Sequence, residues 1–341
     1  MHFDLLEHHT ATGFKNPEPD FEEKKFRDLL KWGIIDRIKG IRPQHPDHYS
    51  FPLVYQKNDF KHAHEMPIAL TWIGHSSYLI TLNGINILTD PIWSDRCSPL
   101  QVFGPKRYAV PGIPFEDLPP IDVVLISHNH FDHLDRDTIR RLGNKPRYFI
   151  PLNLKPFFDQ LGITNISEHD WWEGDSFKNL QITSTPAQHF SGRGLRDRNK
   201  SLWCGWIVSI SSFKLYFAGD SGYFSGFREI GNRFGPIDIA LIPIGAYLPR
   251  WFMKPVHLSP AEAVQAYLDV KAEIFIATHW GTFDLADEAL DDPPVKLREE
   301  IIRKKLNPDL FWIFRHGESR TPTMEVFDLS HNQRVVLNAI K

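Results

Sequence analysis

The sequence predicts an α/β protein built from layered sheets that are covered by helices. The first observation behind this class is the order of the apolar segments, in which short runs typical of strands lead and helical patterns come between some of them. The second is that most of these expected strands end at a histidine or an aspartate. This repetition predicts that polar side chains converge on one rim of the sheets.

The composition of the sequence argues against several classes of protein. The 341 residues can bury a real core and hold one large domain or two smaller ones. A formal net charge of −3 gives no general attraction to nucleic acid, so no nucleic-acid partner is expected. The first ten residues do not read as a signal peptide, and no apolar run approaches the roughly 20 residues that span a bilayer. We therefore expect a cytoplasmic protein or one that rests on a membrane surface.

Residues 1–66 are expected to be an N-terminal extension packed on a main domain of residues 67–341. The extension is patchy and rich in proline and histidine. Its charged segment 19–40 predicts one amphipathic helix. The apolar positions of that segment follow helical spacing only approximately: Phe26, Leu29, Leu30, Ile34 and Ile38.

From Ile68 the chain carries clear turn and helix signals. Alternating residues on either side of Asn83-Gly84 predict a hairpin with a type I′ turn. A proline-rich loop over about 91–120 then leads to a buried strand over 121–127 and to a short helix ended by Gly143. A later helix has Ser259 as N-cap, Pro260 at its first position and Glu262 closing a capping box. Further strands are expected at 180–187, 202–210, 213–220, 237–245 and 273–280.

Seven candidate metal ligands follow these strands. His128, His130, Asp132 and His133 come after the strand at 121–127, and the other three follow later strands: His189, Asp220 and His279. Imidazole and carboxylate are ligands that suit zinc and similar divalent ions. One catalytic zinc takes three protein ligands, so seven ligands fit two ions that share a carboxylate. A lone histidine is more often a surface or core residue, but a buried cluster of this kind without metal is electrostatically costly.

The candidate ligands and several longer segments resemble a known family. The segment SHNHFDH together with His189, Asp220 and His279 resembles the metallo-β-lactamase superfamily, and Asp90 in LTDP matches an early aspartate that supports the metal ligands there. The segments TWIGHSSYLI, LTDPIWSDRCSP, FGPKRY, GAYLPRWFMK, HLSPAEAV and HGESR resemble the N-acylphosphatidylethanolamine-hydrolysing phospholipases D. This similarity runs from about Ile68 to Arg320, and residues 1–66 carry little of it.

The resemblance implies an αββα sandwich, a single domain with an N-terminal extension. It implies two Zn²⁺ ions, with Mn²⁺ or Fe as alternatives. One ion would be held by His128, His130 and His189, the other by Asp132, His133 and His279, and Asp220 would bridge them. A metal-bridging hydroxide would attack phosphorus in N-acylphosphatidylethanolamine and release an N-acylethanolamine and phosphatidic acid. It also implies catalytic roles for Asp132, Asp220 and His257, a phospholipid substrate, a membrane surface and a homodimer.

Two loops are expected to contact substrate or membrane. The first, 245–255, combines apolar and basic side chains that suit the headgroup boundary, although an ordinary core loop is the alternative: Tyr247, Arg250, Trp251, Phe252, Met253 and Lys254. The second, 191–201, directly follows His189 and is expected to hold an anionic phosphodiester or an anionic membrane through basic residues such as Arg193, with a merely solvated loop as the alternative. The alternative for His257 is a structural role, in which it satisfies the loop that precedes the helix beginning at Pro260.

The sequence leaves other functional hypotheses open. The same metal site would suit a lactonase, or a phosphodiesterase acting on another lipid or a nucleotide, since this fold hosts many chemistries. A non-catalytic, metal-stabilised binding protein is a third hypothesis, which the number of ligands disfavours. His75 is expected on a strand near the hairpin, in a supporting or core role. Surface or packing roles are expected for the histidines without a constellation, among them His8, His9 and His316.

Overall fold

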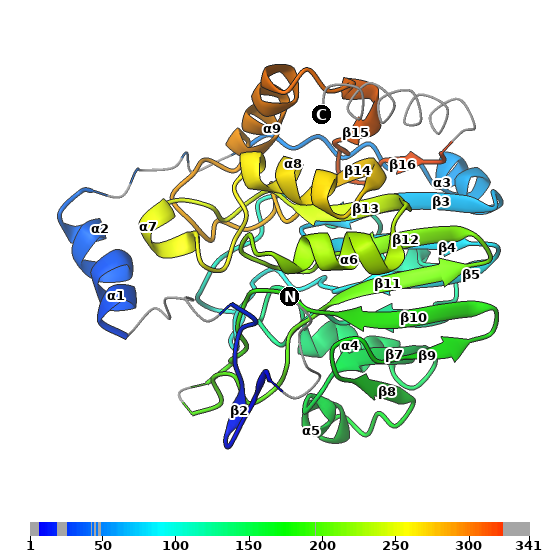
Figure 1. Ribbon diagram of the computed structural model, residues 1–341, viewed down its shortest axis with the longest axis horizontal. Coiled ribbons are helices and arrows are strands. Elements are labelled where there is room, and N and C mark those ends of the chain that lie inside the picture. Colours follow the sequence, from blue (N-terminus) through cyan, green and yellow to red (C-terminus); the bar gives the residue numbers. More distant parts are fainter. Residues whose placement is uncertain are drawn as a thin grey trace.

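Two seven-stranded sheets pack face to face, and helices cover both outer faces (Figure 1). The computed structural model describes residues 7–18, 26–41, 43, 46, 49–194 and 196–322. This arrangement is the αββα sandwich, so the predicted fold class is confirmed.

The first sheet combines an antiparallel half with a parallel half. In spatial order the strands are β16 (Ser319–Arg320), β3 (Ile68–Gly74), β4 (Ser77–Leu82), β5 (Ile85–Thr89), β6 (Val123–Leu125), β7 (Arg147–Pro151) and β8 (Ile166–His169). Neighbouring strands from β16 to β5 pair antiparallel, and those from β5 to β8 pair parallel.

The second sheet has the same mixed character. Its last four strands in chain order are parallel, and the others pair antiparallel. In spatial order the strands are β15 (Phe311–Trp312), β14 (Ala272–Thr278), β13 (Ile237–Pro243), β12 (Phe213–Phe217), β11 (Gly205–Ile210), β10 (Leu180–Thr185) and β9 (Gly174–Phe177).

Each sheet is covered by its own helices. On the first sheet these are α3 (Lys57–His64), α4 (Arg136–Leu142) and α5 (Lys155–Asp159), and on the second they are α6 (Gly226–Phe234), α8 (Pro260–Asp269) and α9 (Asp292–Arg303). The remaining short helices are η2 (Phe115–Asp117), α7 (Arg250–Met253) and η3 (Pro308–Leu310).

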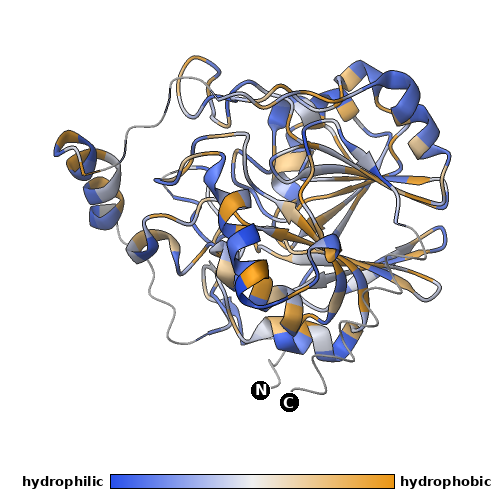
Figure 2. Ribbon diagram, turned by 90° about the horizontal axis from the view of Figure 1, so that it is seen from above, coloured by the Kyte–Doolittle hydropathy of each residue, from blue (hydrophilic) through white to orange (hydrophobic). Residues whose placement is uncertain are grey.

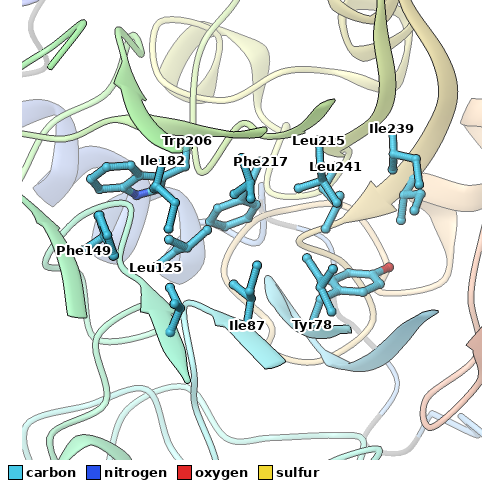
Figure 3. Close-up of a cluster of buried hydrophobic side chains, with 14 of the residues drawn as sticks. Tyr78, Ile87, Leu125, Phe149, Ile182, Trp206, Leu215, Phe217, Ile239 and Leu241 are labelled. Carbon is cyan, nitrogen blue, oxygen red and sulfur yellow. The ribbon is translucent and has the colours of Figure 1, made fainter. Parts of the chain in front are cut away.

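The main core lies between the two sheets. Side chains alternate along a strand, so in β4 the residues Tyr78 and Ile80 join this core, whereas Leu79 joins the apolar layer beneath the helices. Burial on both faces explains the continuous apolar run at β6, whereas β4 is buried on both faces although its sequence mixes apolar and polar residues. Figure 3 shows side chains from both sheets meeting there: Tyr78, Ile87, Leu125, Phe149, Ile182, Trp206, Leu215, Phe217, Ile239 and Leu241.

Most of the expected turns and caps are confirmed. Asn83 (φ 48°) and Gly84 (φ 77°) both have the left-handed backbone of a type I′ turn between β4 and β5. Helix α4 ends at Gly143 (φ 64°), and α8 has the capping box of Ser259 and Glu262. His75 corrects one expectation, because it lies in the turn between β3 and β4 and not on a strand.

The N-terminal region forms two separate structures. A short hairpin of β1 (His9–Thr10) and β2 (Gly13–Phe14) lies against the sandwich. Further on, α1 (Phe26–Leu30), a π-helical turn η1 (Lys31–Ile35) and α2 (Asp36–Ile38) follow one another as one helical run beside α7 (Figure 1). This run agrees with the helix expected in segment 19–40, except that residues 19–25 lie outside the described part of the chain.

Candidate metal centre

Loops at one edge of the sandwich bring the predicted ligands together. His128, His130, Asp132 and His133 follow β6, and the other three follow β10, β12 and β14: His189, Asp220 and His279. Strands that run in the same direction end at the same edge of a sheet, and the two sheets place these edges side by side. Residues far apart in sequence, such as Asp132 and His279, therefore become neighbours.

The first group of ligand atoms is a trio of imidazoles. His128 Nε2 lies 2.8 Å from His130 Nδ1, which in turn lies 3.2 Å from His189 Nε2. His128 and His130 are two positions apart in an extended loop, so both side chains point in the same direction, as predicted.

The second group combines two imidazoles with a carboxylate. Asp132 Oδ2 lies 3.3 Å from His133 Nε2 and 3.5 Å from His279 Nε2. Asp220 Oδ2 is 3.1 Å from each of these two nitrogens and 3.9 Å from His189 Nε2, so it lies between the two groups. The structure thus brings all seven predicted ligands into one cluster, and their binding of metal stays a prediction.

The chemistry of this cluster fits the binding of divalent cations. His133 Nε2, His279 Nε2 and Asp220 Oδ1 are buried and have no hydrogen-bond partner. Such atoms are costly unless something compensates them, and a cation shared by imidazoles and carboxylates would do so. The donor set of five imidazoles and two carboxylates is the one expected for zinc.

The pKa values of the buried imidazoles also favour metal binding. Burial lowers the pKa of His189 to about 3 and that of His130 to about 4, which keeps both imidazoles neutral, the form that binds metal. Burial opposes a charge on His279 as well, but Asp220 and Asp132 outweigh it and raise the pKa of His279 to about 9. Carboxylates that attract a proton so strongly would attract a divalent cation in its place.

Asp90 fixes the orientation of one imidazole from each group. Its Oδ2 accepts a hydrogen bond from His133 Nδ1 at 2.7 Å and another from the Ser127 hydroxyl at 2.5 Å. The same hydroxyl lies 2.9 Å from His128 Nδ1. With their Nδ1 protons directed to this network, His128 and His133 present the lone pair of Nε2 to the centre. The supporting role expected of Asp90 agrees with these contacts.

Three buried aromatic side chains hold the backbone just before three of the ligands. Tyr78 Oη donates to the carbonyl of Ala277 at 2.9 Å, Trp203 Nε1 to that of Ala187 at 2.9 Å, and Trp206 Nε1 to that of Ile126 at 2.9 Å. Each carbonyl belongs to the residue two positions before a predicted ligand, within two residues of the end of its strand. These bonds anchor the ends of β6, β10 and β14.

His257 and His75 also lie at the centre. His257, between α7 and α8, has Nδ1 3.9 Å from Asp220 Oδ2, and burial lowers its pKa to about 3. His75 Nε2 lies 2.9 Å from Asp132 Oδ2, so it belongs to the second group of potential ligands. Like the predicted ligands, it directly follows a strand, here β3, but the sequence did not show where that strand ends.

The backbone around the centre adopts a costly conformation. Asp90 (φ 32°), His75 (φ 54°) and His279 (φ 59°) all lie in the left-handed region, which non-glycine residues rarely occupy. Glycine would fit these positions more easily, so the side chains themselves are what the site requires. By contrast Gly245 allows a close approach, since a Cβ there would lie 2.0 Å from the carbonyl oxygen of His279.

The two loops expected to contact substrate or membrane make many contacts within the protein. Tyr247 and Met253 are buried, and Arg250 pairs with Glu262 at 2.6 Å. Trp251 is 42% exposed, whereas Phe252 stacks on Trp32 of the N-terminal helical run. Contact of Trp251, Phe252 and Lys254 with lipid stays a prediction.

Arg193 lies close to the predicted metal ligands, but one end of its guanidinium bonds to carbonyls within the protein. Its Nη1 donates to the carbonyls of Asn129 and Leu134 at 2.9 and 2.7 Å, and the guanidinium lies 3.9 Å from the ring of Phe131. It therefore braces the HNHFDH loop. It also lines a surface cavity of about 550 Å³ together with Arg136.

Comparison with known proteins agrees with this fold. Residues 85–280 match the family described as beta-lactamase superfamily domain. The chain therefore belongs to the metallo-β-lactamase superfamily and is a metallo-hydrolase.

Individual relatives give a more specific comparison than the family does. The chain is 42% identical over 249 residues to N-acyl-phosphatidylethanolamine-hydrolyzing phospholipase D 1 of Caenorhabditis elegans, a match that covers 69% of this chain and 70% of that protein. It is 36% identical over 260 residues to the mitochondrial N-acyl-phosphatidylethanolamine-hydrolyzing phospholipase D of Saccharomyces cerevisiae, covering 74% of this chain and 55% of that one. The solved structure of isothiocyanate hydrolase from Delia radicum gut bacteria has the same fold, with a TM-score of 0.61 at 19% identity over 75% of this chain and 99% of that chain.

Proposed function

We propose that this protein is a phosphodiester hydrolase of the phospholipase D type that cleaves N-acylphosphatidylethanolamines. One water molecule is consumed, the bond between phosphorus and the ethanolamine oxygen breaks, and phosphatidic acid and an N-acylethanolamine are formed. The observation that carries the proposal is the 42% identity to a relative named for this reaction. The clustering of all seven predicted ligands supports it.

Two divalent ions, which we propose are zinc, would be held at this centre. His128, His130 and His189 would hold one, and Asp132, His133 and His279 the other. Asp220 would contact both, since its Oδ2 lies between the two groups. When bound, such a pair of ions acidifies water and stabilises the negative charge that develops on phosphoryl oxygens.

His257 is the residue that we assign to the leaving group. Its side chain is 14% exposed, whereas those of His133, His189 and His279 are at most 1% exposed, so it faces the side from which substrate arrives. Because burial keeps its imidazole neutral, one ring nitrogen carries a proton and the other accepts one. Its N–H would donate a hydrogen bond to the oxygen of the departing N-acylethanolamine and stabilise the charge that develops there.

Contact with a membrane surface would deliver the lipid substrate. The helical run Phe26–Ile38 exposes Leu29, Ile34 and Ile38, and α7 beside it exposes Trp251. Figure 2 shows hydrophobic and hydrophilic residues mixed along this run. Lys31 Nζ lies 4.4 Å from the ring of Trp251 and 2.7 Å from Asp36 Oδ2, so an ion pair lies next to apolar side chains, as at the boundary between headgroups and acyl chains. No helix in the described ranges has the length and apolar content of a membrane span.

An assay on lipid vesicles tests this proposal. Purified protein is incubated with vesicles that contain N-acylphosphatidylethanolamine, with and without a chelator, and the products are identified by mass spectrometry. We expect phosphatidic acid and N-acylethanolamine in equal amounts, and their loss after chelation. A panel of lactones is assayed in parallel. Turnover of lactones alone would show that the metal centre serves a different reaction.

A further inference from the structure

The N-terminal extension contacts the backbone of a predicted metal ligand directly. The Asn16 side chain is buried, and its Nδ2 donates to the carbonyl of His189 at 2.8 Å. Its Oδ1 accepts the N–H of His189 at 2.9 Å. One side chain thus satisfies both backbone groups of a residue that lies in a loop, where no neighbouring strand can pair with it.

The segment Glu7–Glu18, which we call the strap, is fastened on one side of Asn16 by a histidine pair. His8 Nε2 and His9 Nε2 each lie 2.6 Å from a different oxygen of Asp170. The His8 ring also stacks on Trp171, with 4.1 Å between ring centroids. Hydrogen bonds to a carboxylate are among the stronger ones in proteins, so this end of the strap is firmly held.

Other contacts fasten the strap around and beyond Asn16. Phe14 is 4% exposed and belongs to the core between the sheets, and its N–H donates to the carbonyl of Asn199 at 2.8 Å. Glu18 Oε1 accepts the N–H of Ser225 at 2.7 Å, in the loop that follows Asp220. The strap therefore bonds to the loops that carry two of the ligands.

From this arrangement we propose that the strap is part of the metal centre and that Asn16 is a positioning residue for His189. His189 is held at two points: Val256 O lies 2.9 Å from its ring Nδ1, and Asn16 holds its backbone. Without Asn16, both backbone groups of His189 lose their partners, and the contact of its Nδ1 with Val256 O is left to position Nε2 beside His130. The proposal rests on the proposed metal centre and adds a residue 173 positions away in sequence to it.

Release of metal to a chelator tests this role without measuring turnover. Asn16→Ala removes both hydrogen bonds, and Asn16→Asp places an oxygen opposite the carbonyl of His189. Lys15→Ala, at the exposed neighbouring position, is the matched control. The fully loaded proteins are mixed with a chromophoric chelator, and the release of each ion is followed in time. Near-ultraviolet circular dichroism reports whether each variant is folded.

We expect one of the two ions to leave about tenfold faster in both Asn16 variants, since residues that orient metal ligands typically change metal affinity by 10- to 100-fold. Lys15→Ala should release metal as the wild type does. Release at the wild-type rate from folded Asn16 variants, even with a lower melting temperature, would refute the positioning role alone. A wild-type protein that retains no ion would refute the metal centre and this proposal with it.

Discussion

Asp90→Asn is the substitution that tests the support of the metal centre most sharply. Asp90 is fully buried and accepts three hydrogen bonds, from the Ser127 N–H at 2.7 Å, the Ser127 hydroxyl at 2.5 Å and His133 Nδ1 at 2.7 Å. An asparagine of the same shape can keep the first bond through its oxygen. Its NH2 group then replaces the oxygen that faces His133 Nδ1.

The consequence for His133 is a change of tautomer. To accept a hydrogen bond from that NH2 group, Nδ1 must give up its proton, and the proton moves to Nε2, the atom that faces Asp132 and Asp220. A protonated Nε2 cannot bind metal. Loss of such support typically weakens metal binding by about 10- to 100-fold, or about 1.4 to 2.8 kcal/mol. Because Ser127 links Asp90 to His128 as well, we expect both ions to be affected.

Competition with a chromophoric chelator at neutral pH measures this loss. Asp137→Asn is the control, because Asp137 is an exposed aspartate that pairs with Arg140. The control should bind metal as the wild type does. If folded Asp90→Asn protein bound both ions with unchanged affinity, the account of how Asp90 selects the tautomer would be wrong.

Three further substitutions test other parts of the account. Asp220→Asn should lower turnover by more than about 100-fold with an unchanged circular dichroism spectrum, because Asp220 lies between both ligand groups; activity within tenfold of the wild type would remove that role. Tyr78→Phe leaves the buried carbonyl of Ala277 without its partner and should lower the free energy of unfolding by about 1–3 kcal/mol in urea titrations; an unchanged midpoint would contradict this. Trp251→Ser removes an indole that is 42% exposed and should weaken sedimentation with anionic vesicles about fivefold; equal sedimentation would argue against lipid contact at this site.

The clustering of the seven candidate ligands was predictable from the sequence for a physical reason. Five of them follow β6 or β14, apolar runs that are buried on both faces, so the end of the run marks the edge of a sheet. The strand β10 before His189 instead alternates buried and exposed residues. The turn at Asn83-Gly84 and the cap at Ser259 were equally predictable, since both depend on local chemistry.

Other features had weak local signals. Helix α6 contains Gly226 and Gly231, and β8 and β9 are short strands at sheet edges, so neither kind of element stands out in the sequence. His75 was expected on a strand, because only the pairing of β3 with β4 shows that it occupies a turn. The contact between Asn16 and His189 depends entirely on tertiary structure, and no sequence pattern indicates it.

Hydrolysis in water enriched in ¹⁸O is the most direct test of the central claim, that the centre directs water to phosphorus. Vesicles of N-acylphosphatidylethanolamine are incubated with the metal-loaded protein, and both products are analysed by mass spectrometry. The account predicts one ¹⁸O atom in phosphatidic acid and none in the N-acylethanolamine. Label in the N-acylethanolamine would mean that a carbon–oxygen bond is broken, and it would contradict the account.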